Sequence, residues 1–304
     1  MNRLLSFVSM TVVACIATLG LTISTTTAQD ATPAATPVAA FSGLPQVNVT
    51  VTDSEIDVFD AQIPAGYVVL MVTNNSSDST GVGVLGPAPG ETMDQLEQEA
   101  ATPPAAGTDF PPFFYKATIA GGPGNIPPGE THQAVVNVPA GDWVLVSEGD
   151  QPPTPVTAVE TADSVTTPPT ADVQITESDF LFSGFDAVQP GSQVWEVTNT
   201  GQQPHMLVFA KVPDGTTVDD IRKVASEPDN ATPAPDEMQE SDFMFPGGDV
   251  ILQSSGQTVY ASMDITEGTY AAICFVTDPA TGQPHAMEGM ISVFHVGGSA
   301  TPAA

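Results

Sequence analysis

The chain has 304 residues, which is enough for two domains of ordinary size, each with its own core. Only five residues are Lys or Arg against 36 Asp and Glu, and the formal net charge is −31. This charge excludes nucleic acid and anionic lipid as partners, and a protein that docks through charge should be basic. Solubility, or adaptation to salty or acidic surroundings, explains the same charge equally well.

The first 28 residues predict a secretory signal peptide. Arg3 precedes an apolar run from Leu4 to Ile23, and small residues end at Ala28, the predicted cleavage point. Cleavage leaves four basic residues and a formal charge of −32. We therefore expect a protein secreted to the extracellular or cell-envelope space, without a membrane span after signal removal. The alternatives are a retained membrane helix and a lipoprotein processed at Cys15, although the apolar run continues past that cysteine.

Segments rich in Ala, Thr and Pro divide the remaining chain into two blocks. We expect a disordered linker over 29–44, a first domain over 45–158, a linker over 159–170, a second domain over 171–297 and a disordered tail over 298–304.

Short strands separated by Gly, Pro and Asn fill both blocks, which predicts an all-β fold. Each block also has one short helical segment, over 92–101 and 217–226. The predicted strands are 47–51, 67–73, 134–138 and 143–146 in the first block, and 172–175, 193–198, 206–210, 258–263, 269–275 and 291–296 in the second.

The two blocks repeat one pattern at an interval of about 125 residues. Val72-Thr-Asn74 matches Val197-Thr-Asn199, Gly121-Gly122 matches Gly247-Gly248, and the Gly141 turn matches the Gly268 turn. An ordered repeat of this length indicates two copies of one domain.

Soft, polar side chains gather in the second copy only. Removal of the signal leaves Cys274 as a lone cysteine, which cannot form an internal disulfide. His205 follows a Pro early in the block, and Cys274 is followed by Pro284-His285 and Gly289-Met290. One thiolate, two imidazoles and a weak thioether form a ligand set that suits both oxidation states of copper.

These motifs resemble those of the cupredoxins, the blue or type 1 copper proteins such as plastocyanin. Asn199-x-Gly-x-x-Pro-His205, Tyr270-x-x-x-Cys274 and Pro284-His285-x-x-x-Gly-Met290 are similar to the family's three ligand-bearing segments. The resemblance implies two tandem Greek-key β-sandwiches and one type 1 copper site in the second domain. It implies the metal ligands His205, Cys274, His285 and Met290.

The spacing after the cysteine departs from the family pattern. Ten residues separate Cys274 from His285, where small cupredoxins have only a few, and Met287 competes with Met290 as the axial ligand. In the first copy Thr80 and Ser147 align with His205 and Cys274. We therefore expect the first domain to lack metal and to serve packing, spacing or partner binding.

The resemblance implies a one-electron carrier that serves a redox partner with a basic surface. In the family, the electron passes through the exposed edge of the late histidine, here His285. Its apolar neighbours would form the docking patch: Pro204, Met206, Pro284, Ala286 and Met287. An enzyme is not expected, because the chain has four histidines and Cys274 is flanked by Ile273 and Phe275. The alternatives are a cuprous-ion store or scavenger and a copper-free surface or partner-binding module.

Overall fold

A computed structural model describes residues 39–102, 111–226 and 238–297. The predicted signal peptide, the cleavage point, Cys15 and the predicted tail 298–304 lie outside the described residues. Within the described ranges, no helix is both long and apolar enough to cross a membrane.

The first block folds into two packed sheets, because alternate Val and Ile side chains of its strands point into a shared core. In β1, for example, Val47, Val49 and Val51 are buried and their neighbours are not. One layer has the order β2-β1-β4-β7 and the other the order β3-β9-β8-β5-β6. The strands are β1 (Gln46–Val51), β2 (Ile56–Val58), β3 (Gln62–Pro64), β4 (Gly66–Asn74), β5 (Val82–Gly86), β6 (Thr118–Gly121), β7 (Thr131–Val138), β8 (Gly141–Ser147) and β9 (Thr154–Val159).

The second block repeats this architecture, with layers β11-β10-β12-β15 and β14-β13-β16-β17. Aromatic rings fill its core, including Phe209 stacked on Tyr270 with ring centroids 4.9 Å apart. The strands are β10 (Val173–Ser178), β11 (Leu181–Ser183), β12 (Gly191–Asn199), β13 (His205–Val212), β14 (Val250–Gln253), β15 (Thr258–Ile265), β16 (Gly268–Ile273) and β17 (Ile291–Val296).

Both predicted helices are present. Helix α2 (Met93–Ala100) begins at a capping box, in which Thr92 and Gln95 each bond the other's backbone amide. Helix α3 (Val218–Ser226) buries Ile221, Val224 and Ala225. A third helix, α4 (His285–Glu288), was not predicted. The 3₁₀ turns are η1 (Ala39–Phe41), η2 (Pro112–Tyr115), η3 (Phe185–Ala187) and η4 (Glu240–Asp242).

Matching strand registers support the proposed alignment of the two blocks. Gly83 pairs with Val146 between β5 and β8, and Val208 pairs with Ile273 between β13 and β16. These are aligned positions in the two copies. Thr80 and Ser147 therefore occupy the places that His205 and Cys274 occupy in the second copy.

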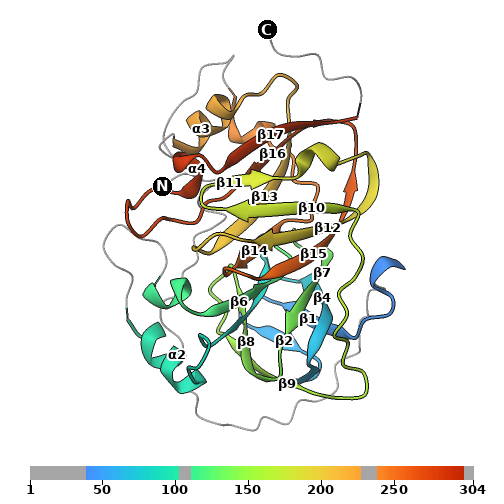
Figure 1. Ribbon diagram of the computed structural model, residues 1–304, viewed down its shortest axis with the longest axis vertical. Helices are drawn as coiled ribbons and strands as arrows, with labels where there is room; N and C mark the ends of the chain where they lie inside the picture. Colours follow the sequence, from blue (N-terminus) through green and yellow to red (C-terminus); the bar gives the residue numbers. More distant parts are fainter. Residues whose placement is uncertain (1–38, 103–110, 227–237, 298–304) are drawn as a thin grey trace.

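The two sandwiches are joined edge to edge. Strand β15 pairs with β7 through Tyr260 with Val135 and Ala261 with Ala134, which makes one continuous eight-stranded sheet. Figure 1 shows the two sandwiches stacked, with β15 and β7 side by side between them. A second link pairs Pro123 with Val250. The domains thus share backbone hydrogen bonds as well as side-chain packing.

Two sequence expectations need correction. The 29–44 linker was expected to be disordered, but its described part is ordered from Ala39, because Phe41 is fully buried against the β4–β7 face. Several strands were also missed, namely β2, β3, β5, β6, β9, β11 and β14. Most of these strands are shorter than six residues, and glycine interrupts Val82–Gly86. Such segments show no clear alternation of apolar and polar residues.

Candidate metal centre

The predicted ligands come from one end of the second sandwich. His205 begins β13, Cys274 follows the last residue of β16, His285 begins α4, and Met290 directly precedes β17. All four side chains are fully buried. The fold therefore gathers residues that are up to 85 positions apart in the sequence.

Three donor atoms converge at this end. The Sγ of Cys274 lies 3.8 Å from Nδ1 of His205 and 3.5 Å from Nδ1 of His285, and the two Nδ1 atoms are 3.1 Å apart. A group of this kind can hold one metal ion. Two imidazoles and one thiolate are soft and borderline donors, so the set fits copper.

Met290 is tied to this group through its backbone. Its amide donates to the carbonyl of His285 at 2.9 Å, and its carbonyl accepts from the amide of Cys274 at 3.2 Å. Met287 lies in α4 and is only partly buried. Met290 therefore stays the predicted axial ligand.

The long segment between Cys274 and His285 folds out as a closed excursion. Thr277 pairs with Pro284 across its base, and the amide of His285 donates to the carbonyl of Val276 at 2.7 Å. The Ala286 amide then donates to the carbonyl of Cys274 at 2.8 Å. His285 thus returns to Cys274 as it would after a shorter loop, and the extra residues do not separate the donors.

Burial sets the protonation of the donors. It raises the pKa of the Cys274 thiol far above its usual range, although the amides of Met206 and Val276 stabilise the thiolate. Burial, followed by the charge of His205, lowers the pKa of His285 to about 4. Burial also lowers the pKa of His205, against the opposing effect of Asp179. Both imidazoles are therefore neutral near pH 7, and a bound cation would favour the thiolate.

Each imidazole is held through its outer nitrogen. Nε2 of His205 lies 2.9 Å from Oδ1 of Asp179, and Nε2 of His285 lies 3.1 Å from Oε1 of Gln203. Gln203 in turn donates to Asp278 at 3.1 Å. Such partners fix the ring orientation and leave Nδ1 directed at the metal position.

A buried polar pair lies behind His205. Gln253, which pairs with His205 across the β13–β14 ladder, donates to the carboxyl of Glu177 at 2.6 Å. Burial raises the pKa of Glu177 to about 8, and the hydrogen bond from Gln253 lowers it only in part. Glu177 is therefore a neutral acid at pH 7.

Sequence reasoning missed Asp179, Gln203 and Glu177. A signal for Asp179 existed, because Asp53 occupies the aligned place in the first copy and accepts from the Ser77 amide at 2.7 Å. Asp179 accepts in the same way from the Gln202 amide at 2.9 Å. The repeat thus marked a loop-capping aspartate, to which the second copy adds a histidine contact.

The predicted exposed edge of His285 is wrong. His285, Pro204, Met206 and Ala286 are buried, so most of the predicted docking patch does not reach the surface. The ring of Phe180 covers His285 with centroids 4.6 Å apart, and Gln203 occupies its Nε2. The β10–β11 turn, which closes over this end of the sandwich, is the physical cause.

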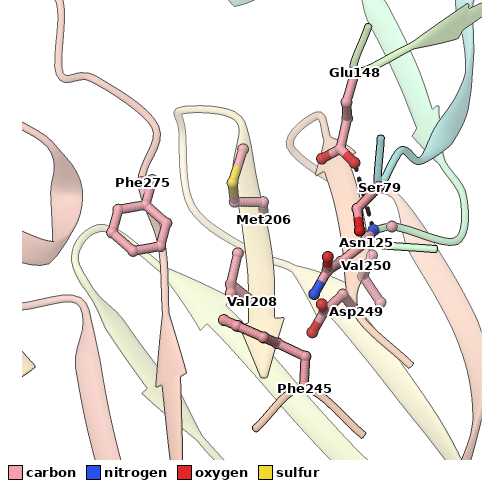
Figure 2. Close-up of a pocket in the computed structure, with 10 residues that line it drawn as sticks. Ser79, Asn125, Glu148, Met206, Val208, Phe245, Asp249, Val250 and Phe275 are labelled. Carbon is pink, nitrogen blue, oxygen red and sulfur yellow. Dashed lines mark hydrogen bonds between the residues drawn. The ribbon is translucent and has the colours of Figure 1, made fainter. Parts of the chain in front are cut away.

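A small cavity of about 30 Å³ lies between the domains beside the metal centre. Figure 2 shows Met206 and Phe275, which follow His205 and Cys274, on one side and Glu148, Asn125 and Asp249 on the other. Burial raises the pKa of Asp249 to about 8. A space of this size holds about one water molecule and no organic substrate.

The other two histidines lie apart from this group. His132 contacts Glu130 at 3.2 Å, and His295 contacts Thr269 at 3.3 Å.

The sequence matches no protein-family model and no curated protein. Among solved structures, it is similar to reduced auracyanin from Roseiflexus castenholzii, at 13% identity over 38% of this chain and 96% of that chain, with a TM-score of 0.26. Auracyanin A, a "blue" copper protein from Chloroflexus aurantiacus, is 16% identical over 38% of this chain and 98% of that chain, with a TM-score of 0.25. A copper-containing nitrite reductase from Thermus scotoductus is 12% identical over 83% of this chain and 61% of that chain, with a TM-score of 0.23.

Overlaps this low carry no functional argument. The fold is the predicted one, two tandem cupredoxin-like β-sandwiches, and the second sandwich holds a buried His-Cys-His group.

Proposed function

We propose that the chain is an exported type 1 copper protein that carries single electrons. One copper ion would be held by His205, Cys274, His285 and Met290 in the second domain. The observation that supports this most strongly is the convergence of three buried donor atoms, with a spread below 4.8 Å, in a sandwich that offers soft ligands. Copper in such a set exchanges one electron with little rearrangement of its ligands.

The surrounding residues support the same role. Asp179 and Gln203 hold both imidazoles in place, and complete burial of the donors excludes water from the site. A rigid, dry site keeps one geometry in both oxidation states. The tight backbone ring around Cys274, His285 and Met290 adds to that rigidity.

The site favours a carrier over an enzyme. The adjoining cavity of about 30 Å³ has no room for an organic substrate. Residues Ile273 and Phe275 flank Cys274, so no histidine links it to a second metal position. The chain's four histidines leave only His132 and His295 for such a position, and these have other contacts.

We place the docking surface for the redox partner at the β10–β11 turn. Phe180 lies on His285, and the neighbouring Leu181 is 56% exposed, so apolar surface next to the site is open to a partner. Asp179 precedes Phe180 in the turn, and Glu288 precedes Gly289, which lies beside the Phe180 carbonyl, so both add negative charge, in keeping with a partner that has a basic surface.

The test is a visible spectrum of residues 29–304 after addition of cupric ion. We expect an intense thiolate-to-copper band that a reductant bleaches reversibly and that Cys274→Ser abolishes. The matched control is Ser147→Ala, at the aligned position of the first domain, which should leave the band unchanged. Tight uptake of cuprous ion without colour would instead indicate storage. No uptake of either ion would contradict the proposal and leave a copper-free binding module.

A further inference from the structure

One short segment of the first domain contacts both parts of the chain that carry the metal ligands. This segment, Tyr115–Ile119, runs from the end of η2 into β6. Its contacts cross the domain boundary at the Cys274–His285 excursion and at the strand beside His205. Neither contact was predicted from the sequence.

The first contact holds the base of the excursion. The Tyr115 hydroxyl donates to the carbonyl of Thr277 at 2.6 Å. Thr277 pairs with Pro284, and the preceding Val276 accepts the amide of His285. Tyr115 therefore acts at the point where the chain leaves Cys274 and returns to His285.

The second contact holds the strand beside His205. The Ser254 hydroxyl donates to the carbonyl of Ala117 at 2.7 Å, and the Ile119 amide donates to the same hydroxyl at 3.0 Å. The Ser254 amide donates to the Ile119 carbonyl at 2.9 Å. Ser254 directly follows Gln253, the ladder partner of His205.

We propose that the 115–119 segment is a positioning element of the metal centre. It fixes the strand beside His205 and the loop of Cys274 and His285 to one rigid piece of the first domain. A ten-residue excursion has more conformations to lose than a short loop, so an external contact at its base restricts it most. The inference rests on the proposed copper site and gives the first domain, in which no metal is expected, a role in it.

The test removes a single hydroxyl group. In the full mature chain without metal, Tyr115→Phe should make the His285 and Ala286 amides exchange with deuterium about 2–10-fold faster, the range for loss of one hydrogen bond. With copper, the same variant should shift the thiolate-to-copper band and raise the copper Kd about 2–10-fold. Ser254→Ala should act in the same direction from the His205 side.

The matched control is Tyr67→Phe. Tyr67 also lies at the domain boundary, where its ring and that of Tyr260 pack T-shaped with centroids 6.1 Å apart, but it is on β4, away from the excursion. It should change neither the exchange of His285 nor the band. Equal exchange and an equal spectrum in Tyr115→Phe and the parent would overturn the positioning role. Absence of a band in the parent would overturn the proposed function instead, and the exchange rates would still decide the role of Tyr115.

Discussion

The candidate metal centre lies at one end of the second sandwich, and the corresponding end of the first sandwich has the same scaffold but different side chains. In both copies a buried Asn ends the second long strand and binds two carbonyls, Asn74 those of Asp78 and Ile126, and Asn199 those of Gln203 and Gln253. Around this frame, Thr80 and Ser147 of the first copy stand where the second has His205 and Cys274.

The residues behind the ligands differ as well. In the first copy, Val51 pairs with Asn74, and Ile126 bridges to Thr80. In the second, Glu177 pairs with Asn199, and Gln253 pairs with His205. The side chains of Val51 and Ile126 are buried, and so are those of Glu177 and Gln253. Two apolar side chains in the first copy therefore stand in place of a polar pair in the second. A sandwich of this kind does not need the polar pair to fold, which associates the pair with the metal centre.

The largest expected effect tests whether the frame is truly shared. Asn74→Ala and Asn199→Ala should each lower the free energy of unfolding by about 3 kcal/mol, because each removes two hydrogen bonds to carbonyls and takes the side-chain acceptor from a buried amide, that of Ser76 or Gly201. Urea unfolding of the metal-free protein measures both.

Only Asn199→Ala should also weaken copper binding, by about tenfold, because the loop that Asn199 holds runs through Gln203 to His205. Equal loss of copper affinity in Asn74→Ala would show that the measured effect is general destabilisation and not a local one.

The next effect separates the two loop-capping aspartates. Asp179 is partly buried, which opposes ionisation, yet bonds from Gln202, Gln203 and His205 lower its pKa below the usual range. Asp179→Asn removes the charge next to the His205 imidazole, so the copper Kd should rise about tenfold. Asp53→Asn makes the same change where no histidine is present and should leave the Kd unaltered. Copper titration against a competing chelator gives both values.

Much of this comparison could be predicted from the sequence. The repeat, the strands with clear alternation and the order of His205, Cys274, His285 and Met290 depend on local pattern, which one sequence displays. Phe180, Gln203 and Tyr115 reach the centre through contacts with residues 82 to 162 positions away, and the contact of Tyr115 also crosses the domain boundary. Their residue types carry no signal of this, which is why the covered edge of His285 was predicted as exposed.

A third effect concerns pH. Folded Glu177 keeps its proton up to about pH 8, whereas the unfolded chain releases it near 4.5, so unfolding releases a proton in between. Asp249, with a pKa of about 8, acts in the same direction. Raising the pH from 6.5 to 8 should therefore lower the stability of the metal-free protein, by about 1 kcal/mol per pH unit from each group.

Below pH 6.5 His285 acts in the opposite direction and should make the slope shallower, because the unfolded chain protonates His285 while the folded chain, with a pKa of about 4, does not. The double variant Glu177→Val with Gln253→Ile copies the first domain. It should lose the share of Glu177 in the slope between pH 6.5 and 8 and retain those of Asp249 and of Glu148, whose pKa burial raises to about 7. An unchanged slope would mean that Glu177 is ionised in the folded protein.

The smallest effect calibrates the others. Thr73 and Thr131 of the first copy join their hydroxyls across β4 and β7 at 2.8 Å, and Thr198 and Thr258 do so across β12 and β15 at 2.9 Å. Thr73→Val and Thr198→Val should each cost about 0.5 kcal/mol, the usual range for a half-buried cross-strand pair, and should leave copper unaffected. Urea unfolding resolves a difference between them of about 0.5 kcal/mol. A larger difference would mean that the two scaffolds are not energetically equivalent, and the contrasts at Asn199 and Asp179 would then reflect the scaffold as well as the ligands. Equal values would assign those contrasts to the metal centre alone.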